Sequence, residues 1–171
     1  HNTVAKGLFL CKRARPDIQL TIASMTTSVL TPNESDWLKV KRLLQYIKGT
    51  MKKVLTLSID NVRVINWYVD VSFAVHPDFK SHTGAIMVMG SGGIIGMSRK
   101  QKLNTRSSTE AELVGADDAV TMILWTRLFL EEQGYQVEKN ILYQDNKSAI
   151  LLETNGARSA GKRSRALNVR Y

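Results

Sequence analysis

Three acidic residues stand out because an acidic side chain is unexpected at each position. Asp70 and Asp145 close apolar runs that favour β-strands, although Asp is depleted in strands. Glu110 lies in the first turn of a predicted long amphipathic helix. Clustered carboxylates repel one another unless a cation neutralises them, and hard oxygen ligands select Mg²⁺ or Mn²⁺. If the fold brings these three residues together, the sequence predicts a divalent-metal site.

Glu110 has a structural alternative, because Ser107 and Glu110 have the spacing of a helix capping box. Thr109 and Glu112 have the same spacing, so spacing alone leaves both roles of Glu110 open. The helix also carries an apolar stripe of Leu113, Val120, Leu124 and Leu128. Glu110 lies at the edge of this stripe, which we expect to face a sheet. We therefore assign Glu110 to the metal site and leave Glu112 to cap the helix.

The other polar and aromatic candidates have simpler interpretations. Asn146 is a good cap for the helix that follows, which leaves Asp145 available. We expect Asp117 and Asp118, in the middle of the long helix, to be solvated. We do not expect His76 or His82 to bind metal. Three aromatic residues are predicted to be core residues: Trp67, Tyr68 and Trp125.

The chain is strongly basic, with 24 Lys and Arg against 15 Asp and Glu and a net charge of +9. This surplus favours a polyanionic partner. Two basic clusters adjoin the acidic motifs in sequence: Arg99, Lys100, Lys102 and Arg106, and then Arg158, Lys162, Arg163, Arg165 and Arg170. A third cluster, 39–53, is interpreted as the solvated face of a helix. The single cysteine, Cys11, excludes an intrachain disulfide and fits a reducing compartment.

The pattern of elements changes near residue 50. Helices are predicted before Pro16, from Pro16 to Val29, and after a cap at Asn33 or Ser35 up to Gly49. Beyond them we expect a strand or extended arm at 54–59, strands at 62–69, 83–89 and 94–98, a helix at 108–132, a strand at 141–144, a helix from 147 to about 153, a loop at 154–164 and a helical turn near Ala166.

Five sequence blocks occur in an order that resembles a known family. They are Trp67-Tyr68-Val69-Asp70, His82-Thr83-Gly84-Ala85, Ser98-Arg99-Lys100-Gln101, Ser107-Ser108-Thr109-Glu110-Ala111-Glu112 and Gln144-Asp145-Asn146-Lys147-Ser148-Ala149. From about Trp67 to Tyr171 the chain resembles the ribonuclease H domain of copia-type retrotransposon polyproteins. The upstream part resembles the C-terminal end of the reverse transcriptase, through Lys12-Arg13-Ala14-Arg15-Pro16-Asp17-Ile18, Trp37 and Leu43-Leu44-Gln45-Tyr46-Ile47-Lys48-Gly49-Thr50.

The resemblance implies a mixed α/β, ribonuclease H-like fold. An antiparallel three-strand meander is followed by a crossover helix and a strand parallel to the first. We expect residues 1–53 to be a helical reverse transcriptase segment and residues 54–171 to be the ribonuclease H-like domain, without the last strand and helix of the fold. In the family a fourth metal-binding Asp lies beyond the equivalent of Tyr171, and Ala166 stands where relatives commonly carry His. The strand at 141–144 is then a sheet edge, open to self-association.

The resemblance also implies an activity, the Mg²⁺-dependent hydrolysis of the RNA strand of an RNA–DNA hybrid, with Mn²⁺ as a substitute. Asp70, Glu110 and Asp145 would hold two ions about 3.5–4 Å apart. The nucleic-acid contacts expected are Ser72, Arg99, Lys100, Lys102, Arg106, Ser108, Thr109 and Asn146. The alternative is a catalytically impaired remnant that binds hybrid or RNA. Expected partners are the hybrid and the upstream reverse transcriptase. No membrane contact is expected, and the location is intracellular, in a cytoplasmic particle or the nucleus.

Overall fold

The computed structural model describes residues 1–155. Most of the expected loop at 154–164, the turn near Ala166 and the last basic cluster lie outside the described residues. None of the described helices combines the length and apolar character needed to cross a bilayer.

The N-terminal part is helical, as the sequence predicts. Its helices are α1 (Asn2–Arg13), the short 3₁₀ helix η1 (Pro16–Ile18), α2 (Gln19–Thr26) and α3 (Glu34–Gly49). Pro16 suits the start of η1 because its fixed φ is already helical. Asn33 caps α3 through a reciprocal capping box with Asp36. These helices enclose a small core of Val4, Cys11, Ile18, Ile22, Met25 and Leu43. The second helix ends earlier than predicted, at Thr26 rather than Val29.

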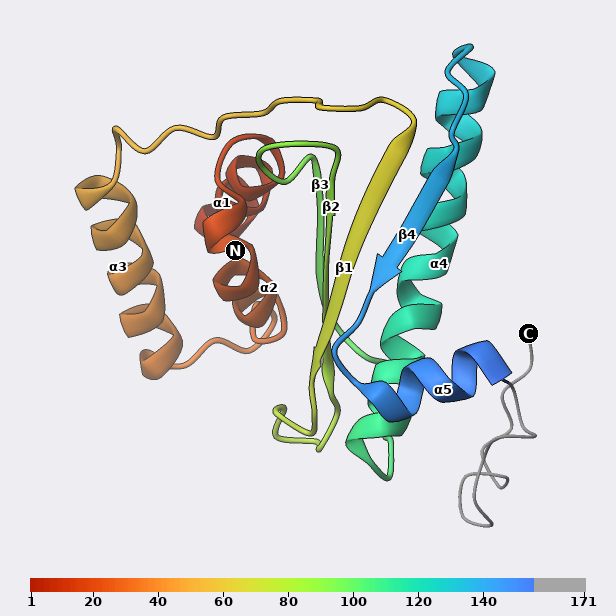
Figure 1. The fold of residues 1–171 in the computed structure, drawn as a ribbon. Coiled ribbons are helices and arrows are strands. Elements are labelled where there is room, and N and C mark those ends of the chain that lie inside the picture. The colour runs from red at the N-terminus through yellow and green to blue at the C-terminus, as the bar shows by residue number, and fades with distance from the viewer. Residues whose placement is uncertain (156–171) are drawn as a thin grey trace.

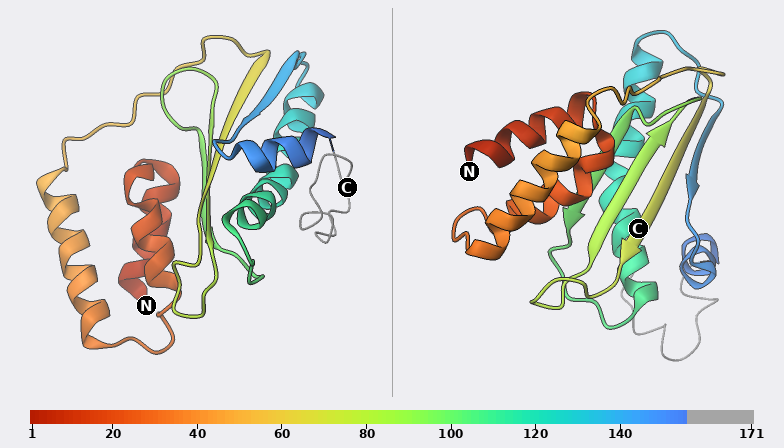
Figure 2. Two further views of the ribbon diagram at one scale, coloured as in Figure 1. Left: turned by 60° about the horizontal axis from the view of Figure 1, so that its bottom comes forward. Right: turned by 90° about the vertical axis from the view of Figure 1, so that its left-hand side faces the viewer.

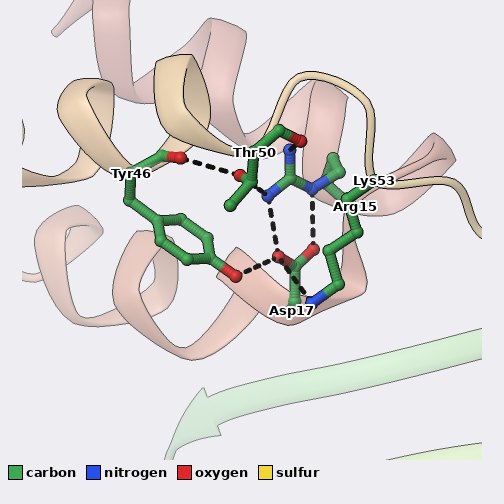
Figure 3. Close-up of polar contacts among 5 residues, drawn as sticks. All are labelled: Arg15, Asp17, Tyr46, Thr50 and Lys53. Carbon is green, nitrogen blue, oxygen red and sulfur yellow. Dashed lines mark hydrogen bonds and ion pairs between the residues drawn. The ribbon is translucent and has the colours of Figure 1, made fainter.

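A polar clamp joins the end of α3 to η1 (Figure 3). The buried Arg15 guanidinium donates to both carboxylate oxygens of Asp17, at 2.9 and 2.8 Å. It also donates to the backbone oxygen of Thr50 at 3.2 Å and to its Oγ1 at 2.7 Å. Tyr46 donates its hydroxyl proton to Asp17 at 2.8 Å, and Lys53 lies 3.7 Å from the same carboxylate. This arrangement satisfies a buried positive charge and fixes how α3 sits against η1.

The C-terminal part contains a four-stranded mixed sheet. Its strands are β1 (Val64–Ser72), β2 (His82–Val88), β3 (Ile95–Lys100) and β4 (Lys139–Tyr143), in the order β3-β2-β1-β4. The β1–β2 and β2–β3 pairs are antiparallel, and β4 pairs parallel to β1 after the crossover helix α4 (Ser108–Glu132). This is the order and orientation expected from the sequence. Among the described strands β4 is an edge, also as expected, and α5 (Lys147–Asn155) follows it.

Helices cover both faces of the sheet (Figures 1 and 2). Helix α4 lies on one face, and α1 and α2 lie on the opposite face, near β3. Alternation along β1 sends Trp67, Val69 and Val71 into the core beneath α4, whereas Tyr68, Asp70 and Ser72 remain exposed on the other face. Lys12 reaches across from α1 and donates to the backbone oxygen of Gly96 in β3 at 3.0 Å.

One detail of the sheet differs from the sequence prediction, and another decides between two predicted alternatives. Strand β1 continues to Ser72, so Asp70 lies inside the strand rather than after it. Residues 54–59 form an extended arm without a regular strand, and Ser58 and Asp60 donate backbone hydrogen bonds to the β2–β3 connection, at Ser91 and Met89. The arm therefore packs along the hairpin without extending the sheet.

Candidate metal centre and adjoining groove

The structure brings three acidic residues from distant parts of the chain together: Asp70 of β1, Glu112 of α4, and Asp145 just after β4. One carboxylate oxygen from each lies within 4.8 Å of those of the other two. Asp70 and Asp145 are exposed, whereas Glu112 is buried. Three hard oxygen donors at this spacing fit a divalent cation such as Mg²⁺ or Mn²⁺.

The unequal lengths of β1 and β4 create this arrangement. Pairing between the two strands ends at Tyr68 and Tyr143, while β1 continues to Ser72. The backbone N–H of Val71 therefore has no partner in β4 and donates to the Glu112 carboxylate instead. The Glu112 side chain occupies the place where the two strands separate, between Asp70 and Asp145.

Gln144 fixes Glu112 from the β4 side. Its Nε2 donates to the backbone oxygen of Glu112 at 3.1 Å and to Oε2 of the same residue at 3.3 Å. The glutamate is thus held by one donor in β1 and one that directly follows β4, although neither donor is charged. A carboxylate supported in this way keeps one orientation, as expected for a residue that holds a cation.

The electrostatics of Glu112 also fit a cation. Burial raises the pKa of Glu112 to about 7, with smaller contributions from the negative charges of Asp70 and Asp145 and an opposing one from the Gln144 hydrogen bond. Three carboxylates without an internal basic partner favour a positive ion among them. No Lys or Arg of residues 1–155 forms an ion pair with any of the three.

The structure thus brings Glu112, and not the predicted Glu110, to Asp70 and Asp145. The Glu110 backbone N–H donates to Ser107 Oγ at 3.2 Å, and its carboxylate accepts from the backbone N–H of Arg106 at 2.7 Å. Glu110 thus has the local capping role that its spacing left open, and Glu112 does not cap the helix.

The difference arises because another face of α4 packs on the sheet than the apolar stripe predicts. The expected stripe is largely exposed: Val120, Leu124 and Leu128 are 41%, 54% and 60% accessible. The stripe that contacts the sheet begins with Glu112 and continues through small residues and a few larger ones: Gly115, Ala116, Ala119, Ile123 and Thr126. Small residues let the helix approach β1 closely, and their spacing was the signal that identifies Glu112. Trp125, expected in the core, is exposed on the same outer face of α4, and Tyr68, also expected in the core, is exposed because alternation along β1 places it on the face opposite Trp67.

The predicted nucleic-acid contacts do not form one free basic surface. Arg99 pairs with Asp118 at 2.5 Å and Lys100 pairs with Asp78 at 2.7 Å. Asp118 is therefore an ion-pair partner and a hydrogen-bond acceptor for Thr83, not a solvated acid. The side chains of Lys102 and Arg106 have no ion-pair partner among the described residues.

The remaining predicted contacts lie close to the acidic cluster or at helix starts. Ser108 and Thr109 begin α4, and Ser72 is exposed at the end of β1. Asn146 accepts from the backbone N–H of Ala149 at 3.0 Å and so caps α5, as expected.

A groove of about 600 Å³ leads from the acidic cluster along the exposed sheet face. Residues of η1 and α2 form one side, including Pro16 and Leu20. The opposite side contains Tyr68 and Tyr143, whose rings stack with centroids 4.8 Å apart, and Asp70 and Asp145 lie at its end. Sequence reasoning missed Tyr143 and this groove, although each tyrosine precedes an acid by two residues.

Farther along the groove, two histidines and a serine form a hydrogen-bonded chain. His82 Nε2 lies 2.8 Å from Ser98 Oγ, and His82 Nδ1 lies 3.0 Å from His76 Nε2. Burial lowers the pKa of both imidazoles, more than any neighbouring charge does. The pair links the 73–81 connection to β3 through Ser98, and no further His, Cys, Asp or Glu of residues 1–155 joins it to form a metal-binding group.

The chain is similar to parts of retrovirus-related Pol polyproteins from plant transposons. It is 31% identical over 158 residues to the polyprotein of transposon TNT 1-94 of Nicotiana tabacum, which covers 92% of this chain and 12% of that protein. It is also 31% identical over 143 residues to those of transposons RE2 and RE1 of Arabidopsis thaliana, covering 82% of this chain and 10% of each. The chain thus spans about a tenth of the length of each of these polyproteins. No family model and no solved structure matches it.

Proposed function

We propose that this chain is the ribonuclease H part of a retroelement polyprotein and hydrolyses the RNA strand of RNA–DNA hybrids. The observation that carries the proposal is the meeting of Asp70, Glu112 and Asp145 at the end of the groove. The similarity to Pol polyproteins supports a role within a retroelement. Endonucleolytic hydrolysis on a cluster of carboxylates needs no protein nucleophile.

Mg²⁺ would be held by Asp70, Glu112 and Asp145, and would supply activation of a water and charge stabilisation at the scissile phosphate. The exposed carboxylates of Asp70 and Asp145 face the approaching strand. Glu112 remains behind them, oriented by Gln144 and the Val71 N–H. Lys102 and Arg106 precede α4 and are the members of the 99–106 basic cluster best able to contact phosphates, because Arg99 and Lys100 are engaged in ion pairs and these two are not, among the described residues.

A hybrid-cleavage assay tests this function. The substrate is a short RNA–DNA hybrid labelled on the RNA strand, and the controls are the same sequence as double-stranded RNA and as double-stranded DNA. We expect Mg²⁺- or Mn²⁺-dependent cleavage of the hybrid's RNA alone, lost in Asp70→Asn. Hybrid binding should remain in that variant, because removal of a negative charge eases the approach of phosphates.

Two results would contradict the proposal. One is cleavage that persists in Asp70→Asn, which would point to a contaminating nuclease. The other is metal-independent binding of hybrid without cleavage under either cation, which would favour the alternative of a non-catalytic nucleic-acid-binding remnant.

A further inference from the structure

The groove beside the acidic cluster has a lining unlike that of a phosphate-binding surface. No Lys or Arg is found among the described residues that line it, and its charged groups are the carboxylates at one end. The lining of the groove therefore offers little electrostatic attraction to the phosphates of a nucleic-acid backbone. Most of the exposed lining is apolar or aromatic, and the volume of about 600 Å³ falls within the range of pockets for small organic groups.

Two tyrosines give this groove a flat aromatic surface. Tyr68 and Tyr143 lie opposite each other on β1 and β4, with ring planes only 12° apart. They are 46% and 43% accessible, so a substantial part of each ring is exposed in the groove. Stacked rings that expose an outer face can receive a nucleobase, and such stacking tolerates any sequence.

The opposite side and the far end of the groove complete a small binding site. Pro16 and Leu20 provide apolar contacts across from the tyrosines. Ser98 supplies a hydroxyl whose orientation is set by His82, which is itself held by His76. When His76 donates to His82, the latter donates to Ser98, and the serine proton is free to bond a base edge or a sugar hydroxyl.

From this lining we propose that the groove binds one or two unpaired nucleotides that continue from the strand at the acidic cluster. Their bases stack on Tyr68 and Tyr143, and the flanking backbone stays near the cation-binding carboxylates. The inference rests on the proposed function, because it takes the carboxylates as the place where the hybrid binds. Beyond that function, the inference predicts that the chain binds hybrids with an unpaired extension more tightly than blunt hybrids.

The test compares affinities by fluorescence anisotropy, with Ca²⁺ in place of Mg²⁺ to limit cleavage. The probes are a blunt hybrid and the same hybrid with a two-nucleotide extension at the 3′ or the 5′ end. For the native chain we expect at least one extension to tighten binding by about fivefold or more, the lower end of base–aromatic stacking. The ratio of the dissociation constant of the blunt hybrid to that of the extended hybrid measures this preference. Tyr68→Leu and Tyr143→Leu should reduce this ratio toward one, and Tyr143→Phe should retain it because the ring is preserved.

Tyr135→Ala is the matched control, since Tyr135 is 49% accessible and does not line the groove. Its ratio should equal that of the native chain, and circular dichroism should show all variants folded. A native ratio near one with normal blunt-hybrid binding would overturn this inference and leave the proposed function standing. A ratio that survives in both leucine variants would overturn it as well. Failure of the native chain to bind any hybrid would contradict both this inference and the proposed function.

Discussion

Gly115 of α4 lies directly against Val71 of β1. A Cβ at Gly115 would overlap Cγ2 of Val71, and Thr83 lies just beyond. The helix can therefore approach the sheet closely only where it has no side chain, three residues after Glu112. This contact sets the depth at which Glu112 enters the space between β1 and β4.

Gly115→Ala should therefore destabilise the protein, although alanine normally favours a helix over glycine. We expect a loss of about 1–3 kcal/mol in the free energy of unfolding from overpacking, together with weaker hybrid cleavage as Glu112 is displaced. Urea denaturation measures the first effect. Gly49→Ala is the control, because nothing lies within 4 Å of a Cβ there. Equal stability changes in the two variants would show that the Gly115 contact is not tight.

Separate substitution of Glu112 and Glu110 distinguishes the proposed metal-binding role from the helix-capping role. Glu112→Gln should reduce cleavage by about 100-fold or more, because it removes a carboxylate from the cation site. Glu110→Gln should retain cleavage and lose at most about 1 kcal/mol of stability, because it alters only the contact with the Arg106 N–H. Single-turnover rates on labelled hybrid give the comparison, and the opposite ranking would restore Glu110 to the site.

Much of the fold follows from the sequence, because its signals are local. The predicted helix at 108–132 matches α4, and Gly92 and Gly134, predicted in a turn and at a helix end, have positive φ. Asp70 and Asp145 were identified from acids near the ends of apolar runs. The third member of the acidic cluster, Glu112, was not, because choosing between Glu110 and Glu112 depends on which face of α4 packs on β1. Large apolar residues suggested one face, and close packing of Gly and Ala selected the other.

Divalent cations should stabilise the native chain. A cation at ten times its dissociation constant adds about 1.4 kcal/mol, which raises the melting temperature by about 3–6 °C for a protein of this size. Glu112→Gln should be at least as stable as the native chain in EDTA, because it removes a buried charge beside Asp70 and Asp145. It should gain much less on addition of Mg²⁺. Equal gains for both proteins in a thermal-shift titration would mean that the cation binds elsewhere.

The polar clamp of α3 predicts a dependence of stability on pH. The Arg15 hydrogen bonds hold the pKa of Asp17 well below its usual value of 3.8, against the opposing effect of burial. The unfolded chain therefore binds this proton at a higher pH than the folded chain does. The stabilisation is present above about pH 4 and is lost as the pH falls through and below that value.

Asp17→Asn should lower the free energy of unfolding at pH 7 by about 3 kcal/mol, because Arg15 is then buried without a counter-charge. The variant should also lose less stability than the native chain between pH 5 and pH 3. Urea denaturation at several pH values measures both effects. Asp117→Asn, at an exposed position of α4, is the control and should change stability by no more than about 0.5 kcal/mol. Parallel pH curves for the native chain and Asp17→Asn would refute the role of the clamp.

The basic residues before α4 should contribute unequally to hybrid binding. Lys102→Ala should weaken binding to all hybrid sequences and reduce the salt slope by about one, as expected for one lost phosphate contact. Arg99→Ala should act mainly on stability, because Arg99 already pairs with Asp118. Affinities measured between 50 and 200 mM salt, beside denaturation curves, separate the two effects. An unchanged slope for Lys102→Ala would exclude that side chain from the nucleic-acid interface.

The parallel pairing of β1 with β4 ties the metal site to the order of folding. The two strands are about 75 residues apart in sequence, so their contact closes the longest loop in the sheet and is expected to form late. Asp70 lies in β1 and Asp145 just after β4, and Glu112 lies in α4, the helix that connects the antiparallel strands to β4. A partly folded chain in which β1, β2 and β3 have paired, but β4 has not, does not yet bring the three carboxylates together. If the cluster binds a cation as proposed, we expect binding to appear only once β4 has paired with β1, and its rate of appearance to report that step of folding.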